Sequence, residues 1–190
     1  MGEPTSDTDP LVGVPDSFQR LWTPHRMVYV AGDAKPASAD EGDSAAAKAR
    51  CPFCVAPSHD DSESLIVARG EHAFVVLNLY PYNSGHVLVC PYRHVPDYTD
   101  LTAEEVAEIG ALTQKTMRVI RAASNPAGFN IGMNQGVAGG AGIAAHLHQH
   151  VVPRWSGDAN FLPIIGQTKA LPELLADTRD KLAAEWGSIA

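Results

Sequence analysis

A run of alternating histidines stands near the carboxyl end of the chain: His146-Leu147-His148-Gln149-His150-Val151-Val152. Successive side chains of a β-strand point to opposite faces of a sheet, so a strand here places the three imidazoles on one face. Such a row can serve as a metal site, as a hydrogen-bonded relay, as a nucleophile flanked by helper groups, or as a stack without chemistry. One ion bound by all three is the weakest of these, because positions i and i+4 of a strand lie about 13 Å apart.

Four other short segments have the composition of β-strands. Branched and aromatic residues fill each of them, and Gly, Pro or Asn residues separate them from their neighbours. The segments cover residues 65–69, 73–77, 86–90 and 129–133, and the histidine run at 146–152 adds a fifth. We expect the first two to form a hairpin through residues 70–72.

Two helices are predicted to accompany these strands. Thr102 and Glu105 have the spacing of a capping box, and about 20 residues of amphipathic helix follow until Asn125-Pro126 ends it. The expected apolar stripe of this helix is Val106, Ile109, Thr113, Met117 and Ile120. Residues 171–186 form the second helix, with apolar positions Leu171, Leu174, Leu175, Leu182 and Trp186. The order of elements predicts an α+β domain with an antiparallel sheet.

The composition fits one globular domain that follows an extended amino-terminal part. The chain has 190 residues, of which 45% are apolar and 19% are charged. Residues 18–30 are rich in apolar groups and indicate a docked arm. Residues 31–50 contain no branched aliphatic or aromatic side chain and are predicted to be a flexible linker. We therefore expect arm and linker over 1–50 and the folded domain over 51–190.

Charge and cysteine content argue against several classes of protein. The net charge of -8 disfavours a nucleic-acid polymer as partner, because such binding needs a basic surface, whereas a small anionic substrate stays compatible. Three cysteines are too few for a disulfide framework. The sequence shows neither a signal-peptide pattern nor an apolar run long enough for a membrane span. A cytoplasmic location without a membrane partner is expected.

These motifs together resemble the histidine triad (HIT) family, whose signature is His-x-His-x-His followed by two apolar residues. The resemblance covers about residues 51–186 and includes Asn78, His86, the pair Asn134-Gln135 and the segment 153–161, PRWSGDANF. That segment is similar to the branch of bacterial diadenosine tetraphosphate phosphorylases. The family implies an antiparallel sheet of about five strands with two main helices per subunit, assembled as a homodimer or a higher homo-oligomer. It also implies attack at the α-phosphorus of a nucleotide.

The resemblance implies a role for each matching residue. His148 would be the nucleophile that takes the nucleotidyl group as a phosphoramidate, a step that neutral imidazole can perform. His150 would hydrogen-bond the phosphate oxygens, and His86 would fix the tautomer or orientation of the nucleophile. Asn78 would meet the ribose. The bridging and leaving phosphates would lie near Asn134 and Gln135.

The glycine-rich loop 136–142, GVAGGAG, departs from the family pattern. Gly142 stands where many members have a Gln or Ser that touches the phosphates. Glycines let backbone N–H groups approach an anion closely, so we expect this loop, with Asn134 at its mouth, to bind inorganic phosphate. The indole N–H of Trp155 is a further candidate donor. The alternative is a flexible connector, with Trp155 packed under the carboxyl-terminal segment.

Cys51 and Cys54 form a C-x-x-C pair, which is a weak motif by itself. A thioredoxin-like redox pair needs a βαβ context that the predicted elements do not supply. The layout with His94 and His146 resembles a Cys-Cys-His-His zinc site of part of the HIT family. Such a zinc ion would be structural, because four protein ligands leave no open position. The alternative is two unligated thiols beside the linker.

The sequence therefore predicts an enzyme that cleaves dinucleoside polyphosphates, with diadenosine tetraphosphate and inorganic phosphate giving ATP and ADP. The resemblance also allows a divalent cation with the substrate phosphates. Two alternatives stay open. One is a HIT nucleotide hydrolase or phosphoramidase that uses water, and the other is a zinc-stapled nucleotide-binding protein without turnover.

Overall fold

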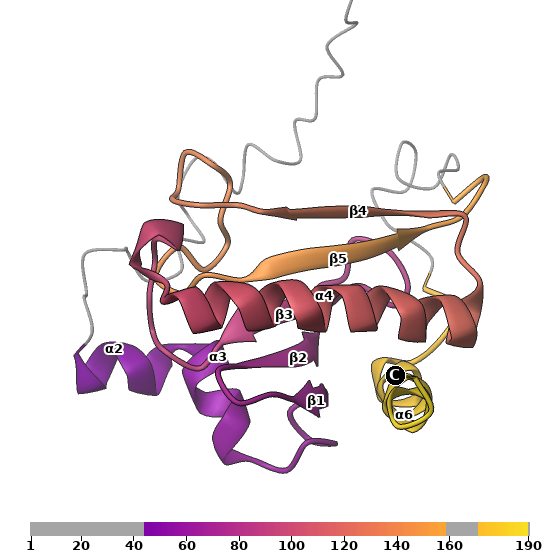
Figure 1. Cartoon of the computed structure of the whole chain (residues 1–190), viewed down its shortest axis with the longest axis horizontal. Helices are drawn as coiled ribbons and strands as arrows, with labels where there is room; N and C mark the ends of the chain where they lie inside the picture. Colours follow the sequence, from indigo (N-terminus) through magenta and orange to yellow (C-terminus); the bar gives the residue numbers. More distant parts are fainter. Residues whose placement is uncertain (1–43, 159–170, 190) are drawn as a thin grey trace, which may run out of the picture. The chain divides into compact units, whose positions relative to one another are not determined.

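The computed structural model describes residues 44–158 and 171–189, and a five-stranded antiparallel sheet is its centre (Figure 1). The strand order is β1-β2-β3-β5-β4. The strands are β1 (Ile66–Arg69), β2 (Ala73–Leu77), β3 (Val87–Pro91), β4 (Gly128–Met133) and β5 (Gln149–Arg154). The α+β class and all five strands predicted from the sequence are confirmed.

Strand β5 begins later than the sequence predicts. The expected strand covered residues 146–152, but β5 starts at Gln149, so His146 and His148 precede it. The pairing with β3 covers only residues 149–151 of β5, where His150 lies opposite Leu88. Before that point the Leu147 N–H donates instead to the Val95 carbonyl at 2.7 Å, which diverts the chain from the sheet.

Helix α4 (Ala103–Ser124) follows the predicted signals at both ends. Thr102 and Glu105 form the capping box, and Asn125 ends the helix in the left-handed conformation with φ 45°. The predicted apolar stripe was partly wrong, because Val106 is exposed. Glu105 turns inward beside it and pairs with Arg93 at 2.6 Å, so the buried face is rotated from the predicted one. That face consists of Glu105, Ile109, Leu112, Thr113, Thr116, Val119 and Ile120.

Helix α6 (Leu175–Trp186) begins four residues later than predicted. Leu171 and Leu174 are exposed and lie outside it, whereas Leu182 is buried. Pro172 disfavours helical geometry at Leu171, and Leu174 has an extended backbone with ψ 150° as the residue that precedes the helix. The helix packs on α4 and β1.

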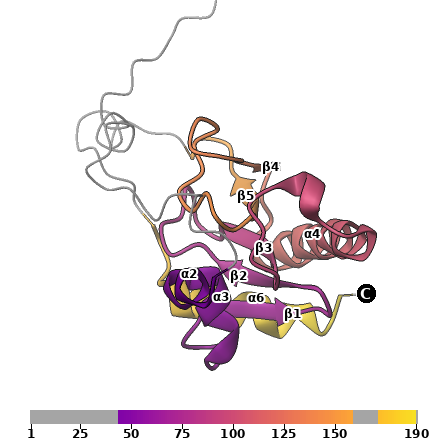
Figure 2. The ribbon, with the colours of Figure 1, turned by 90° about the vertical axis from the view of Figure 1, so that its left-hand side faces the viewer.

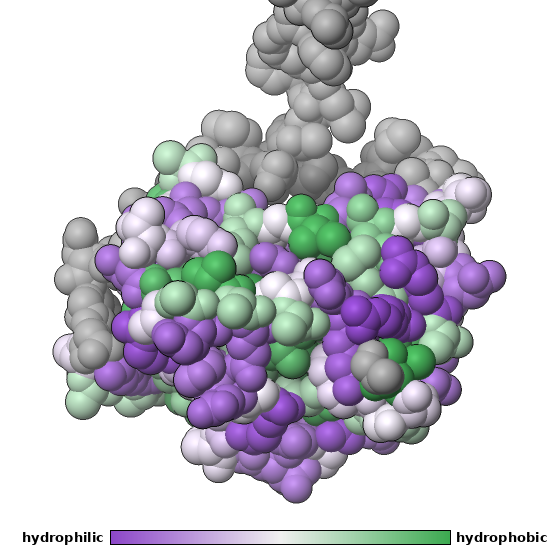
Figure 3. Space-filling view, in the orientation of Figure 1, coloured by the Kyte–Doolittle hydropathy of each residue, from purple (hydrophilic) through white to green (hydrophobic). Residues whose placement is uncertain are grey.

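On the face of the molecule seen in Figure 3, hydrophobic residues occur as separate patches among hydrophilic ones.

Three short helical segments lie close to the start of the predicted domain. They are α2 (Ala45–Arg50), α3 (Pro52–Val55) and η3 (Ala56–Ser58). Helix α2 differs from the flexible linker expected there, because the Ser44 side chain accepts a hydrogen bond from the Ala47 N–H and Ala47 is buried. The arm at 18–30 and most of the linker lie outside the described residues.

Strands β2 and β3 are buried along their whole length, and the two faces of the sheet pack against different clusters. Val75 of β2 points into the core formed with α4 and α6, whereas the neighbouring Phe74 points into a second cluster with Phe53 of α3. Figure 2 shows α4 and α3 on opposite sides of the sheet. His150 lies opposite Leu88, which belongs to the second cluster, so the triad faces α3. Gln149, next to His150, faces the helix side, and its amide donates to Thr113 of α4 at 2.6 Å.

Candidate active site and metal centre

His148 lies in the buried segment just before β5. Its Nδ1 is 2.8 Å from the carbonyl oxygen of His146. A carbonyl only accepts hydrogen bonds, so Nδ1 carries the proton and Nε2 keeps its lone pair. Burial lowers the pKa of His148 below its usual value of 6.5, although the same hydrogen bond opposes the shift. The side chain is therefore a neutral imidazole whose Nε2 can attack an electrophile.

A short chain of hydrogen bonds fixes the tautomer of His150. The Tyr82 backbone N–H donates to Nδ1 of His86 at 2.9 Å, which leaves the proton of His86 on Nε2. This Nε2 lies 2.9 Å from Nδ1 of His150, so His150 accepts there and carries its own proton on Nε2. Among the described residues nothing accepts that buried N–H. Burial, with His148 nearby, lowers the pKa of His150 to about 4.

The position of His86 differs from the expected one. The sequence interpretation placed it as support for the nucleophile His148, whereas the structure places it against His150. The rings of His148 and His150 are 5.0 Å apart between centroids. The unprotonated Nε2 of His148 and the Nε2–H of His150 therefore lie on adjacent rings. The site places a nucleophile beside a hydrogen-bond donor.

Tyr82 is a residue of this site that the sequence interpretation missed. Its ring stacks on His150 at 5.3 Å with an interplanar angle of 16°, and it also contacts His86 at 4.6 Å. The Tyr82 side chain is 48% exposed, so it shields the two histidines and still faces solvent. The available signal was an aromatic residue in the turn between Asn78 and His86.

The structure brings Asn78 to the site but engages Gln135 elsewhere. Asn78 Nδ2 lies 3.4 Å from Nδ1 of His86, and its side-chain oxygen accepts from the Tyr80 N–H. Gln135 instead accepts a hydrogen bond from the Tyr98 N–H at 3.0 Å, which ties it to η4 (Tyr98–Asp100). The side chain of Asn134 is half-buried beside it.

Several of the N–H groups that the sequence offered as phosphate donors are engaged within the protein. The indole N–H of Trp155 donates to the carbonyl oxygen of Ser124 at 3.2 Å, so it satisfies the end of α4 rather than an anion. In the glycine-rich loop the N–H groups of Gly140 and Ala141 bond back within the loop, to Val137 and Gly136. Gly142 follows this turn and is half-buried. The loop is a hydrogen-bonded turn, and these two N–H groups are occupied within it.

The four predicted metal ligands lie together. One ligand atom from each of Cys51, Cys54, His94 and His146 falls within 4.8 Å of the other three. The Nδ1 of His146 is 3.4 Å from both sulfurs, and the Nδ1 of His94 is 3.2 Å from the Cys54 sulfur. Tetrahedral zinc with Zn–S of about 2.3 Å and Zn–N of about 2.0 Å sets such atoms about 3.5 Å apart.

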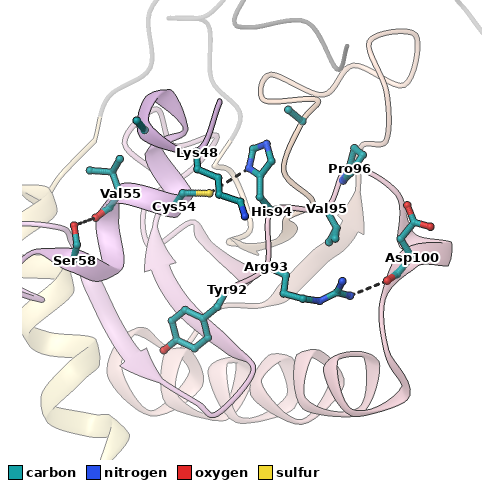
Figure 4. A pocket seen from close by; sticks show the side chains of 12 residues that line it. Lys48, Cys54, Val55, Ser58, Tyr92, Arg93, His94, Val95, Pro96 and Asp100 are labelled. Carbon is teal, nitrogen blue, oxygen red and sulfur yellow. Dashed lines mark hydrogen bonds between the residues drawn. The ribbon is translucent and has the colours of Figure 1, made fainter. Parts of the chain in front are cut away.

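The protonation of His146 also suits a metal ligand. Its Nε2 is 2.9 Å from the Pro91 carbonyl, so Nε2 carries the proton and Nδ1 turns a lone pair toward the sulfurs. Burial lowers the pKa of His146 to about 4, which keeps the ring neutral. Figure 4 shows Cys54 and His94 in contact at a cavity of about 1040 Å³, whose described lining includes no triad histidine.

Comparison with known proteins identifies the family of this chain and agrees with its fold. The HIT domain family matches residues 59–157, and the chain belongs to the HIT family. More particularly, it is 53% identical over 175 residues to the "AP-4-A phosphorylase" of Mycobacterium tuberculosis. The aligned region covers 92% of this chain and 88% of that protein. A "Bis(5'-nucleosyl)-tetraphosphatase [asymmetrical]" of Schizosaccharomyces pombe is 35% identical over 95 residues, 50% of this chain and 52% of that one.

A solved structure of the same family shares this fold. A zinc-bound histidine triad family protein from Mycobacterium smegmatis is 27% identical to this chain, with a TM-score of 0.61. The match covers 74% of this chain and 96% of that one.

Within the described residues, 44–158 and 171–189, no helix combines the length and apolar character needed to cross a membrane.

Proposed function

We propose that this chain is an enzyme that converts diadenosine tetraphosphate and inorganic phosphate into ATP and ADP. The observation that carries the proposal is the pair formed by the bare Nε2 of His148 and the adjacent Nε2–H of His150. The 53% identity to the AP-4-A phosphorylase supports the choice of substrate.

The reaction runs in two displacements at one phosphorus atom. Nε2 of His148 attacks the α-phosphorus, a P–N bond forms, and the bond from that phosphorus to the bridging oxygen breaks with release of ATP. The Nε2–H of His150 donates a hydrogen bond to a phosphate oxygen as charge develops there. An oxygen of inorganic phosphate then attacks the same phosphorus, the P–N bond breaks, and ADP leaves with His148 restored.

One observation favours water as a second candidate acceptor. The Trp155 N–H and two N–H groups of the loop 136–142 are engaged within the protein, which removes donors from the proposed phosphate site. With water, the second displacement yields AMP in place of ADP. Asn134, Gly142 and the remaining N–H groups of the loop stay the proposed phosphate contacts, and a divalent cation would neutralise the substrate phosphates.

The proposal extends to the metal, the assembly and the location. Zinc held by Cys51, Cys54, His94 and His146 would be structural, since four protein ligands fill a tetrahedron. Strand β4 lies at the edge of the sheet with Ile131 48% exposed, which suits pairing with a second copy in a homodimer. The free cysteines suit a reducing cytoplasm. We propose residues 51–190 as the HIT domain.

Product analysis tests the function. The protein is incubated with diadenosine tetraphosphate, with and without inorganic phosphate, and the nucleotides are separated by chromatography. ADP and ATP formed only with phosphate support the phosphorylase. AMP and ATP without phosphate would assign a hydrolase, and no turnover in either mixture would leave a nucleotide-binding protein.

A further inference from the structure

The sheet holds His150 but does not hold His148. His148 precedes β5, so no ladder hydrogen bond fixes its backbone, although its side chain must aim Nε2 at a phosphorus atom. The described contacts that fix this segment come from other elements. The Leu147 N–H donates to the Val95 carbonyl, next to His94, and Nδ1 of His146 faces Cys51 and Cys54.

Phe53 connects this segment to the cysteine pair. It lies between Cys51 and Cys54 in α3, and its side chain is buried. The ring centroid of Phe53 is 5.0 Å from that of His148, at an interplanar angle of 44°. The same ring meets His146 edge-on at 5.5 Å. One aromatic side chain thus contacts both the nucleophile and the residue whose carbonyl accepts a hydrogen bond from the nucleophile's Nδ1–H.

We propose that Phe53 is a positioning residue that fixes the ring orientation and tautomer of His148. This inference rests on the proposed function, in which His148 is the nucleophile. An imidazole turns about its Cβ–Cγ bond with little intrinsic preference, so its orientation must come from neighbours. Phe53 blocks the rotation that would carry Nδ1 away from the His146 carbonyl, and the lone pair of Nε2 stays directed at the substrate.

The C-x-x-C turn then has two functions. Its sulfurs face His146, and the residue between them contacts His148. A ring that only filled the apolar cluster would affect stability alone. A positioning ring affects the chemical step, because small displacements of a nucleophile cost rate while leaving substrate affinity nearly unchanged.

The test compares Phe53→Leu with the matched control Phe74→Leu in the full chain. Phe74 is a fully buried ring of the same apolar cluster, and it stacks on Tyr92 at 5.2 Å. Four quantities are measured: the melting temperature, the zinc content, the single-turnover rate of adduct formation on His148, and the imidazole nitrogen signals in ¹H–¹⁵N spectra. The spectra report which nitrogen of His148 carries the proton, and they need no turnover.

We expect Phe53→Leu to keep its zinc and its KM and to form the adduct about tenfold to a hundredfold more slowly, with mixed His148 tautomers. Phe74→Leu should melt earlier and keep the wild-type rate and tautomer. Unchanged rate and tautomer in Phe53→Leu would overturn the inference, as would loss of zinc together with the rate, or equal losses of rate in both variants. A wild-type protein that forms no adduct refutes the proposed function instead, and the tautomer signals still decide the role of Phe53.

Discussion

His148 and Asn differ in one property that matters at this position, which is a nitrogen lone pair that can attack phosphorus. Asn at 148 keeps a side-chain N–H that can donate to the His146 carbonyl, so the local hydrogen bond can survive. We expect His148→Asn to abolish turnover and to bind nucleotide with nearly unchanged affinity. Initial rates and calorimetric titration check this. Turnover above about one per cent of the wild-type rate would contradict the nucleophile assignment, since loss of a nucleophile costs far more than that.

The buried pair of His86 and His150 gives a pH-dependent stability. The native pKa of His150 is about 4, below its ordinary value of 6.5. Between these two values the unfolded chain takes up a proton at this residue and the native chain does not, so the free energy of unfolding falls as the pH is lowered. Urea unfolding of the wild type at pH 7.5 and at pH 5 should show this loss. His150→Gln should show a smaller loss over the same interval, and an equal slope would contradict the assignment.

At the scale of elements, one carboxylate of α4 closes the hairpin between β1 and β2. Glu108 accepts hydrogen bonds from the N–H groups of Glu71, His72 and Ala73, at 2.8, 2.5 and 2.8 Å. Gly70 is favoured beside it, because a Cβ there would lie 2.5 Å from the Glu108 oxygen and 2.9 Å from the backbone oxygen of Ala73. The helix and the hairpin therefore stabilise each other.

Glu108→Gln should destabilise the protein, because an NH₂ group would replace one acceptor facing these donors. Hydrogen bonds to a charged group contribute about 1.5–3 kcal/mol each, so we expect a loss of at least about 2 kcal/mol in the free energy of unfolding. Denaturant titration measures it. The control Glu63→Gln removes the same charge from an exposed position and should change stability little. Equal stability of the two variants would show that the hairpin does not depend on Glu108.

Local signals predicted the elements, and long-range contacts account for what they missed. The capping box at Thr102 and the run of branched and aromatic residues in β2 were readable because both depend on neighbouring residues. The position of His148 before the start of β5 could not be predicted from the sequence, since it depends on a hydrogen bond between Leu147 and Val95. The same holds for Trp155, whose N–H meets Ser124 across 31 residues.

The candidate site divides in the same way. The cysteine spacing marked Cys51 and Cys54, and the resemblance to the HIT family implied His94 and His146 as the other two candidate ligands, which the structure brings together with them. Tyr82 and Phe53 escaped notice because a single aromatic residue in a turn is more often a packing residue than part of a site. The sequence identified His86 as a site residue but not His150 as its hydrogen-bond partner, because the register of β3 against β5 decides which triad histidine His86 contacts.

For the whole molecule, the four candidate metal ligands come from three separate parts of the chain. Cys51 and Cys54 stand at the start of the domain, His94 follows β3, and His146 precedes β5. An ion that links them restricts the unfolded chain and fixes segments that hold few backbone hydrogen bonds of their own. Binding free energy at such a site is folding free energy.

The protein should therefore copurify with one equivalent of zinc per chain, and Cys51→Ser should lose most of it. Loss of a structural zinc removes several kcal/mol of folding free energy, so this variant should melt at a lower temperature than the wild type. Cys90→Ser is the matched control: Cys90 is also a buried thiol, but it is not one of the four ligands, so this variant should keep its zinc. Elemental analysis and thermal unfolding measure both effects. Wild-type protein purified without chelators and containing no zinc would refute the metal site and leave the assignment of His148 intact, because the hydrogen bond from its Nδ1 to the His146 carbonyl involves no ligand atom.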